Sequence, residues 1–385
     1  MNKVLVIHNK YKNKGGEDIA VADEVKVLKN YYDVKLLYFE NSLSNKLSTF
    51  IGLLLNYNFK SINQVKREIQ NFCPDIIYFH NTWFKLSPRL INSIAKKNKK
   101  IIIKIHNYRI YCSDTYLIKN HLSRDQNNFC PACFKSKKNG FNFFNKVFED
   151  SYLKSFFVIM HSKVMKKVLD RNNIKILVLN EFQKNKFNKI LVNSEIQILQ
   201  NVKNISSINF NESSEKKYIV YAGRISKEKG VENLILSFLD ANLSQVKLKI
   251  IGDGPQLKYL KNTYRNNNID FIGELDNLNT LFYIYNSLAV VTATKMFEGQ
   301  PTLLSEASLM GVLSVFPDFG GMPEYFPKNY QFKFEQYNYK DLTKKLILLE
   351  DQQFRNDTAE NVKEYYINKY SEDRYYETVK SIFKI

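Results

Sequence analysis

The sequence of 385 residues has four cysteines, five histidines and no long apolar run. Four cysteines in a chain of this length do not make a disulfide framework, so we expect reduced thiols and a cytoplasmic protein. The most apolar stretch, residues 50–55, is far shorter than the roughly 20 residues that a membrane-spanning helix needs. No signal peptide is expected, because the apolar run at residues 4–7 is followed at once by His8 and reads as a buried strand.

Acidic side chains are scarce in the first half of the chain. Residues 1–200 contain 34 Lys and Arg against 15 Asp and Glu, whereas residues 201–385 contain 23 of each, so the net charge of +19 lies in the first half. A basic half indicates an anionic partner, such as nucleic acid, anionic lipid headgroups or a lipid diphosphate. No recognisable nucleic-acid-binding module accompanies the charge, so we expect no nucleic-acid partner.

Apolar runs alternate with helical patterns along the chain. This alternation predicts an α/β protein of parallel sheets with helices on both faces, whose ligands bind at the carboxyl ends of strands and in the cleft between two domains. We expect a first domain at 1–200, a second at 201–365 and a C-terminal helix at 366–385 that packs back on the first. The expected strands are 3–8, 34–39, 75–80, 100–105, 176–179, 196–199, 218–221, 246–251, 269–272, 288–293 and 312–316.

The most informative segment is residues 297–307, where Glu298 and Glu306 flank Pro301. Proline suits the first turn of a helix, so we expect a loop that carries Glu298 and a helix that begins near Pro301. Free backbone N–H groups at a helix start attract phosphate, and one carboxylate accepts hydrogen bonds from two vicinal hydroxyls. The segment predicts a sugar-nucleotide site, with ribose on Glu306 and the sugar at Glu298, although two solvated acids are the plain alternative. The diphosphate would meet Pro301, Thr302 and Leu303.

Basic or glycine-rich turns follow several of the predicted strands. Arg224 and Lys229 come after the strand at 218–221, where a guanidinium and an ammonium both suit a diphosphate. Surface cations and ordinary tight turns would explain each feature taken alone. The glycines whose backbone N–H groups would face an anionic ligand are Gly15, Gly16, Gly252, Gly320 and Gly321.

Polar residues also follow two strands of the first half. His106 ends the apolar run at 101–105, and His80 and Asn81 end the strand at 75–80. The carboxyl end of a parallel strand faces the ligand cleft, so these side chains are candidates for hydrogen-bond or acid–base work. A lone histidine is more often structural.

In this order along the chain, these features resemble the retaining glycosyltransferases of family 4. Two departures concern Gln200-Asn201-Val202, where many relatives have Asn-Gly-Val, and Phe297-Glu298-Gly299-Gln300, which replaces the commoner Glu-Pro-Phe-Gly and bears on which donor sugar fits. The matching segments are Gly15-Gly16-Glu17-Asp18, His80-Asn81 with Pro88, His106, Asn201-Val202, Gly223-Arg224 with Lys229, Gly252-Asp253-Gly254-Pro255, Glu298 with Glu306, and Gly320-Gly321.

The resemblance implies the GT-B fold, in which two Rossmann-like domains face each other across a cleft. It implies transfer of a hexosyl group, with retention, from a UDP- or GDP-sugar to a lipid-linked or oligosaccharide acceptor, with no cofactor and no metal ion required. His106 and Glu298 would be catalytic, and His80 and Asn81 would bind the acceptor. The basic half would meet an anionic inner-membrane surface during assembly of capsule, lipopolysaccharide or a similar polysaccharide. The implied donor-binding residues are Gly15, Gly16, Arg224, Lys229, Gly252, Pro301, Thr302, Leu303, Glu306, Gly320 and Gly321.

The absence of an Asp-x-Asp sequence agrees with metal-independent transfer. Cys130-Pro131-Ala132-Cys133 has the spacing of half a zinc knuckle, with Cys112 and His121 as further candidate ligands. Because only half of the motif is present, plain reduced thiols are favoured over a structural zinc site.

Other interpretations stay open. A sugar phosphorylase or a nucleotide-sugar epimerase would use the same fold, and a nucleic-acid-binding protein would explain the charge. Residues 43–57 carry an apolar helical face, which favours a helix packed on the sheet, with contact to a membrane or a lipid acceptor as the alternative.

Overall fold

The computed structural model describes residues 1–10, 15–40, 58–83, 86–95, 100–108, 110–111, 152–171, 174–203, 217–243 and 245–383. The chain forms two compact units. The first comprises the chain up to Val202 together with the segment from Glu372 onward, and the second comprises Lys203–Ser371. The helix expected at 43–57, and the candidate zinc ligands Cys112, His121, Cys130 and Cys133, lie outside the described residues.

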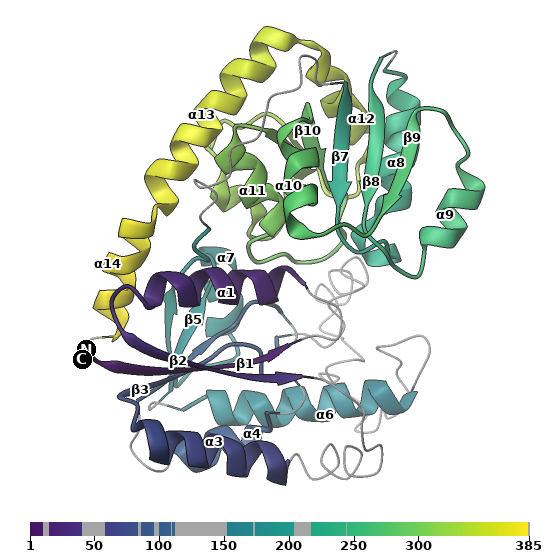
Figure 1. Cartoon of the computed structure of the whole chain (residues 1–385). Coiled ribbons are helices and arrows are strands. Elements are labelled where there is room, and N and C mark those ends of the chain that lie inside the picture. Colours follow the sequence, from purple (N-terminus) through teal and green to yellow (C-terminus); the bar gives the residue numbers. More distant parts are fainter. Residues whose placement is uncertain are drawn as a thin grey trace. The chain divides into compact units, whose positions relative to one another are not determined.

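The first unit is built on a six-stranded parallel sheet in the order β2-β1-β3-β4-β5-β6 (Figure 1). Its central strands are continuous apolar runs, because a parallel sheet with helices on both faces buries every side chain of such a strand. All four residues of β3 are completely buried. The strands are β1 (Lys3–Lys10), β2 (Asp33–Glu40), β3 (Ile76–Phe79), β4 (Lys100–Lys104), β5 (Ile174–Val178) and β6 (Glu195–Ile198).

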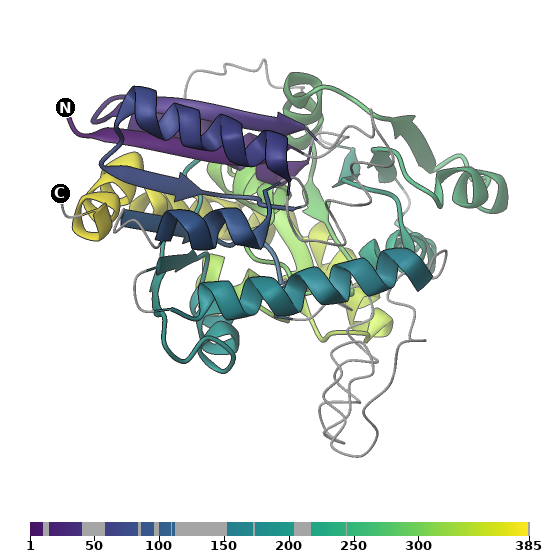
Figure 2. The same cartoon turned by 90° about the horizontal axis from the view of Figure 1, so that it is seen from below.

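Helices cover both faces of this sheet. Helices α3, α4 and α6 lie on the side that is nearest in Figure 2, whereas α1 and α14 share an apolar core with the other face. Helix α14 buries Tyr375, Val379, Ile382 and Phe383, a spacing that places all four side chains on one helical face. The helices are α1 (Gly16–Leu28), α3 (Phe59–Phe72), α4 (Pro88–Ala95), α6 (Tyr152–Leu169), α7 (Glu181–Asn188) and α14 (Glu372–Phe383).

The second unit has its own six-stranded parallel sheet, in the order β12-β11-β10-β7-β8-β9. The predicted strands are present, but the one expected at 288–293 is reduced to three residues. Strand β12 was not predicted, because two residues are too few to show a periodic pattern, and it exists through pairing with β11. The strands are β7 (Tyr218–Ala222), β8 (Lys247–Ile251), β9 (Ile269–Gly273), β10 (Ala289–Val291), β11 (Leu313–Pro317) and β12 (Lys333–Phe334).

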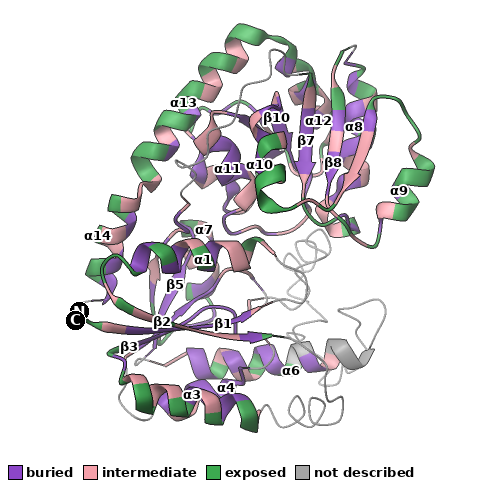
Figure 3. Ribbon diagram, viewed as in Figure 1, coloured by how far each residue is buried: buried purple, intermediate pink, exposed green. Residues whose placement is uncertain are grey.

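The helices of the second unit pack in pairs, α8 with α12 and α10 with α11, while α13 lies beside α11. Helix α13 is mostly exposed (Figure 3), and its buried residues are Val362 and Tyr366. The α-helices are α8 (Val231–Ala241), α9 (Leu257–Thr263), α10 (Asn277–Tyr285), α11 (Thr302–Met310), α12 (Tyr339–Ile347) and α13 (Gln352–Tyr370), and the 3-10 helices are η2 (Lys227–Lys229), η3 (Met322–Tyr325) and η4 (Leu348–Glu350).

Two parallel-sheet α/β units confirm the predicted fold class. Among the described helices, none combines the length and the apolar character that crossing a bilayer requires.

The packing of α14 on the first sheet predicts a large effect of a substitution close to the end of the chain. Ile382 is 2% exposed, so Ile382→Ala should lower the free energy of unfolding of the first unit by about 2–5 kcal/mol. The single tryptophan, Trp83, lies in this unit, so its fluorescence during urea titration measures the effect. The control is Lys380→Ala on the exposed side of α14, and equal unfolding midpoints for the two variants would contradict this packing.

Candidate functional site

The loops that follow β7, β8 and β10 are joined by backbone hydrogen bonds. The N–H of Ile225, after β7, donates to the carbonyl of Asp253, after β8 (2.9 Å). The N–H of Lys295, after β10, donates to the carbonyl of Glu228 (2.8 Å). Because the carboxyl ends of parallel strands meet at one edge of a sheet, candidate residues from separate loops come together there.

Close backbone approach explains two glycines at this edge. A Cβ atom on Gly252 would lie 2.1 Å from the carbonyl oxygen of Gly223, and one on Gly230 would lie 2.1 Å from that of Ala293. Gly252 also has a φ of +130°, which favours glycine. The N–H of Gly252 already donates to the Gly273 carbonyl (2.7 Å), so Gly252 has a packing role within the sheet.

Lys229 and Glu298 are in direct contact. Lys229 Nζ lies 2.6 Å from Glu298 Oε1, and the hydroxyl of Thr294 donates to the same oxygen (3.1 Å). The two side chains are 28% and 20% exposed, so this is a partly solvated ion pair at the edge of the sheet. A group bound by Lys229 and a group bound by Glu298 would therefore be close neighbours.

The loop that carries Glu298 is fixed at several points. Phe297 stacks on Phe319, which precedes Gly320 and Gly321, with ring centroids 5.0 Å apart. The amide of Gln300 donates to the hydroxyl of the buried Tyr366 on α13 (3.1 Å). Burial raises the pKa of Tyr366 to about 12, so this hydroxyl keeps its proton at neutral pH.

Helix α11 follows this loop and begins at Thr302. Pro301 is the residue just before the helix, with φ −63°, and Leu303 packs partly buried against the core. Glu306, in the second turn, forms an ion pair with Lys203 (3.0 Å), and each side chain is only 7% exposed. Lys203 was not predicted as a site residue, because a single lysine after a domain boundary carries no pattern.

Arg224 is exposed at the end of β7. The hydroxyl of Tyr221 donates to the Arg224 carbonyl (2.8 Å), which fixes the backbone of the residue that carries the guanidinium. Burial raises the pKa of Tyr221, and the charge of Glu298 adds to the effect, so Tyr221 acts here as a neutral hydrogen-bond donor.

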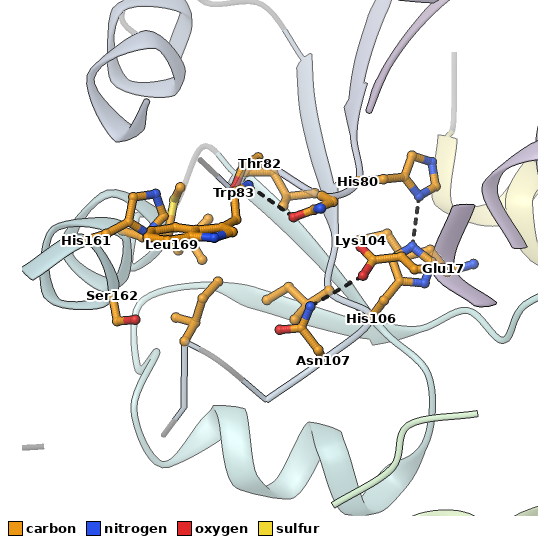
Figure 4. Close-up of a pocket in the computed structure, with 15 residues that line it drawn as sticks. Glu17, His80, Thr82, Trp83, Lys104, His106, Asn107, His161, Ser162 and Leu169 are labelled. Atoms are coloured by element: carbon orange, nitrogen blue, oxygen red, sulfur yellow. Dashed lines mark hydrogen bonds between the residues drawn. The ribbon is translucent and has the colours of Figure 1, made fainter. Parts of the chain in front are cut away.

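A second group of candidate residues lies at the carboxyl ends of β3 and β4 in the first unit, in the pocket of Figure 4. His80 Nδ1 and His106 Nε2 are 2.9 Å apart, so the two predicted histidines form one hydrogen-bonded pair. Asn81 donates to the Asn9 carbonyl (2.7 Å) and accepts from the N–H of Trp83 (3.0 Å), so its amide ties two loops together. The rings of Trp83 and His161, which both line the pocket, meet edge to face with their centroids 4.7 Å apart.

The surroundings of both histidines of this pair favour the uncharged form. Burial lowers the pKa of His80, and the nearby Lys104 and His8 lower it further. Burial also lowers the pKa of His106, with His80 and Lys104 as the next causes. Lys104 was missed at the sequence level, where it looked like an interruption of an apolar run.

Gly15 and Gly16 lie at the start of α1. The N–H of Gly15 donates to Asp18 Oδ2 (3.0 Å), and the other oxygen of this carboxylate meets His8 Nε2 (2.7 Å). The Gly15 N–H is thus already bound by the carboxylate of Asp18, which caps the start of α1.

In the part of the chain that the structure describes, no cluster of three His, Cys, Asp or Glu side chains is arranged to hold a metal ion.

Comparison with known proteins adds to this geometry. Residues 202–366 match the family model "Glycosyl transferases group 1". A GDP-mannose-dependent alpha-mannosyltransferase from Corynebacterium glutamicum is 35% identical over 109 residues, which make up 28% of this chain and 25% of that enzyme. The chain thus aligns with only a quarter of that relative's length.

Two solved structures are similar over their whole length. Sucrose-phosphate synthase from Thermosynechococcus elongatus has a TM-score of 0.73 at 12% identity, covering 100% of this chain and 98% of that one. HepE from Anabaena, in complex with UDP and glucose, has a TM-score of 0.67 at 13% identity, with 100% of both chains covered. The fold is GT-B. Residues 202–366 thus carry the sequence match to the group 1 glycosyl transferases, and the solved structures show the fold of the chain.

The hydrogen bond between Gln300 and Tyr366 predicts that Tyr366→Phe destabilises the second unit. The change removes the hydroxyl that accepts from a buried amide, which should cost about 1–3 kcal/mol in thermal unfolding. Tyr365→Phe is the matched control, because the Tyr365 hydroxyl accepts only an exposed hydrogen bond from Lys369. Similar losses of stability in the two variants would argue against a special role for Tyr366.

Proposed function

We propose that this chain is a retaining glycosyltransferase of family 4 that needs no metal ion. It moves a hexosyl group from a UDP- or GDP-sugar to a hydroxyl of a lipid-linked or oligosaccharide acceptor. The observation that carries the proposal is the contact between Lys229 and Glu298 at the carboxyl edge of the sheet in the unit that matches the group 1 family.

The second unit binds the donor. Glu306 accepts hydrogen bonds from the ribose, and the start of α11 receives the diphosphate together with Arg224 and Lys229. The sugar lies at Glu298, next to the phosphate held by Lys229, in agreement with their 2.6 Å contact. Gly320 and Gly321, which follow Phe319 in the sequence, offer backbone N–H groups to sugar or phosphate oxygens.

Transfer breaks the bond between the anomeric carbon and the diphosphate, and the negative charge that develops is stabilised by Arg224, Lys229 and the helix start. The acceptor hydroxyl attacks from the same face, and its proton passes to the departing diphosphate. Glu298 positions the sugar ring during this exchange. His106 hydrogen-bonds the sugar.

The first unit binds the acceptor, with His80 and Asn81 at the pocket of Figure 4. The surplus of 34 basic over 15 acidic residues in the first 200 suits a lipid-linked diphosphate sugar at the anionic inner face of a membrane. The protein would then be cytoplasmic and peripherally bound there, acting in the assembly of capsule, lipopolysaccharide or a related surface polysaccharide.

Glu298→Gln tests the donor site. With a panel of UDP- and GDP-sugars, the wild-type chain should be stabilised against thermal unfolding by one donor, by about 2.7 kcal/mol at a hundredfold excess over Kd. The variant should keep most of this stabilisation but release nucleoside diphosphate about 100-fold more slowly in the presence of acceptor. Glu335→Gln, an exposed acid of the same unit, is the control. Normal turnover in Glu298→Gln would remove its catalytic role, and formation of a sugar phosphate that requires inorganic phosphate would indicate a phosphorylase.

Charge on the first half predicts salt-sensitive membrane binding. The chain should sediment with vesicles that contain anionic lipid, and binding should fall several-fold between about 50 and 500 mM salt, because salt screens exposed charges. Vesicles of neutral lipid are the comparison. Equal binding to both vesicles at every salt concentration would rule out an electrostatic attachment.

A further inference from the structure

Four polar residues face the same side of the first sheet. Side chains alternate along a strand, so Tyr78 and His80 share one face, as do Lys104 and His106. The register pairs Phe79 with Ile103, so His80 follows beside Lys104. This is the face covered by α1 and α14, because Tyr78 belongs to the apolar core that those helices share.

An ion pair is buried in this layer. Lys104 Nζ lies 2.7 Å from Glu24 Oε2 on α1, and neither side chain has any exposed surface. Lys104 also donates to the Gln200 carbonyl (3.2 Å), and the hydroxyl of Tyr78 donates to Glu24 Oε1 (2.6 Å). Well-packed apolar residues in place of a buried ion pair are often as stable or more so, so stability alone does not account for this pair.

The His80–His106 pair, beside the Lys104–Glu24 ion pair, tolerates little positive charge. A contact of 2.9 Å between His80 Nδ1 and His106 Nε2 needs one nitrogen to donate and the other to accept. If both rings were charged, two N–H groups would face each other. The ring of His80 also lies 4.4 Å from that of Tyr78, which ties the histidine pair to the residue that holds Glu24.

We propose that Lys104, held in place by Glu24 and Tyr78, is a positioning residue that adds to burial in keeping the His80–His106 pair uncharged and so preserves the hydrogen bond between the two rings. His106 then meets a substrate hydroxyl as a neutral hydrogen-bonding group and does not act as an acid. The part that concerns substrate rests on the proposed transferase function, whereas the protonation of the pair does not.

The remaining groups around the pair are consistent with this assignment. The lowered pKa of each histidine has burial as its main cause and Lys104 among the next, and the charge of Glu24 opposes the effect at His106 without cancelling it. Asp18 is paired with His8, and Glu17 is 3.5 Å from the Asn107 amide. Among the described residues, the titratable groups around the pair, including those that reach it through His8 or Glu24, are Glu17, Asp18 and Glu24 on α1, His8 on β1, Tyr78 on β3, Lys104 on β4, His161 on α6 and Tyr375 on α14.

Histidine titration by NMR tests the proposal directly on the full chain. Five histidines give a spectrum that single His→Gln variants can assign. In the wild-type chain His80 and His106 should stay uncharged well below the usual pKa of about 6.5. In the double variant Glu24→Gln with Lys104→Met, which keeps side-chain size but removes both charges, they should titrate at a higher pH than in the wild-type chain, because the effect of Lys104 exceeds that of Glu24. A wild-type His106 that titrates near 6.5 would overturn the proposal without any variant.

The matched control is Lys203→Met, which removes the lysine of the other nearly buried ion pair in the second unit and should leave all histidine titrations unchanged. Unchanged titration of His80 and His106 in the double variant, with a native urea midpoint by Trp83 fluorescence, would reduce the ion pair to a structural role. Should the double variant not fold, Lys104→Met alone should raise the pH at which His80 and His106 titrate, whereas Glu24→Gln alone should lower that of His106. A second readout is the pH dependence of diphosphate release, which should gain an acid limb in the variant. Changed titration without measurable transfer would contradict the function but not the positioning role.

Discussion

The carboxyl edge of a parallel sheet is the constraint on which this molecule depends. Every strand of both sheets runs in the same direction as its neighbours, so the loops that leave the strands gather at one edge. In the second unit this brings Lys229 and Glu298, which are separated by 69 residues in sequence, to 2.6 Å. In the first unit the same rule brings His80 to His106.

The loops at this edge are held by buried or partly buried groups. Gln300 is fixed by Tyr366, Phe297 by Phe319, and the histidines lie beside the Glu24–Lys104 pair. Such supports determine how accurately a site is preorganised, because each lost contact lets the functional side chain move. Two lysine–glutamate pairs are nearly buried among the residues that the structure describes, one in each unit, and they place fixed charge at the groups proposed to meet ribose and sugar.

Much of the fold could be predicted from the sequence, because parallel strands such as the one at residues 4–7 are apolar without interruption and are separated by helical patterns. The loop position of Glu298 and the helix after Pro301 followed from local rules that need no tertiary information. The side chains with which these residues interact could not be predicted from the sequence. That Lys203 meets Glu306, or that Lys104 meets Glu24, depends on packing between segments far apart in the chain. The two-residue strand β12 forms only because it pairs with β11. No sequence pattern indicates that the Asn81 amide hydrogen-bonds to two different loops.

Helix α14 has a consequence for synthesis. The ribosome completes residues 203–371 before it reaches Glu372, yet the core of the first unit needs Tyr375, Val379, Ile382 and Phe383. Domains of a nascent chain usually fold in order from the N-terminus. Here one sheet face of the earlier unit has α1 but lacks α14 until this last helix emerges, so the later unit is free to fold first. A nonsense codon just before position 372 would therefore leave the second unit intact and expose the apolar face of the first to aggregation.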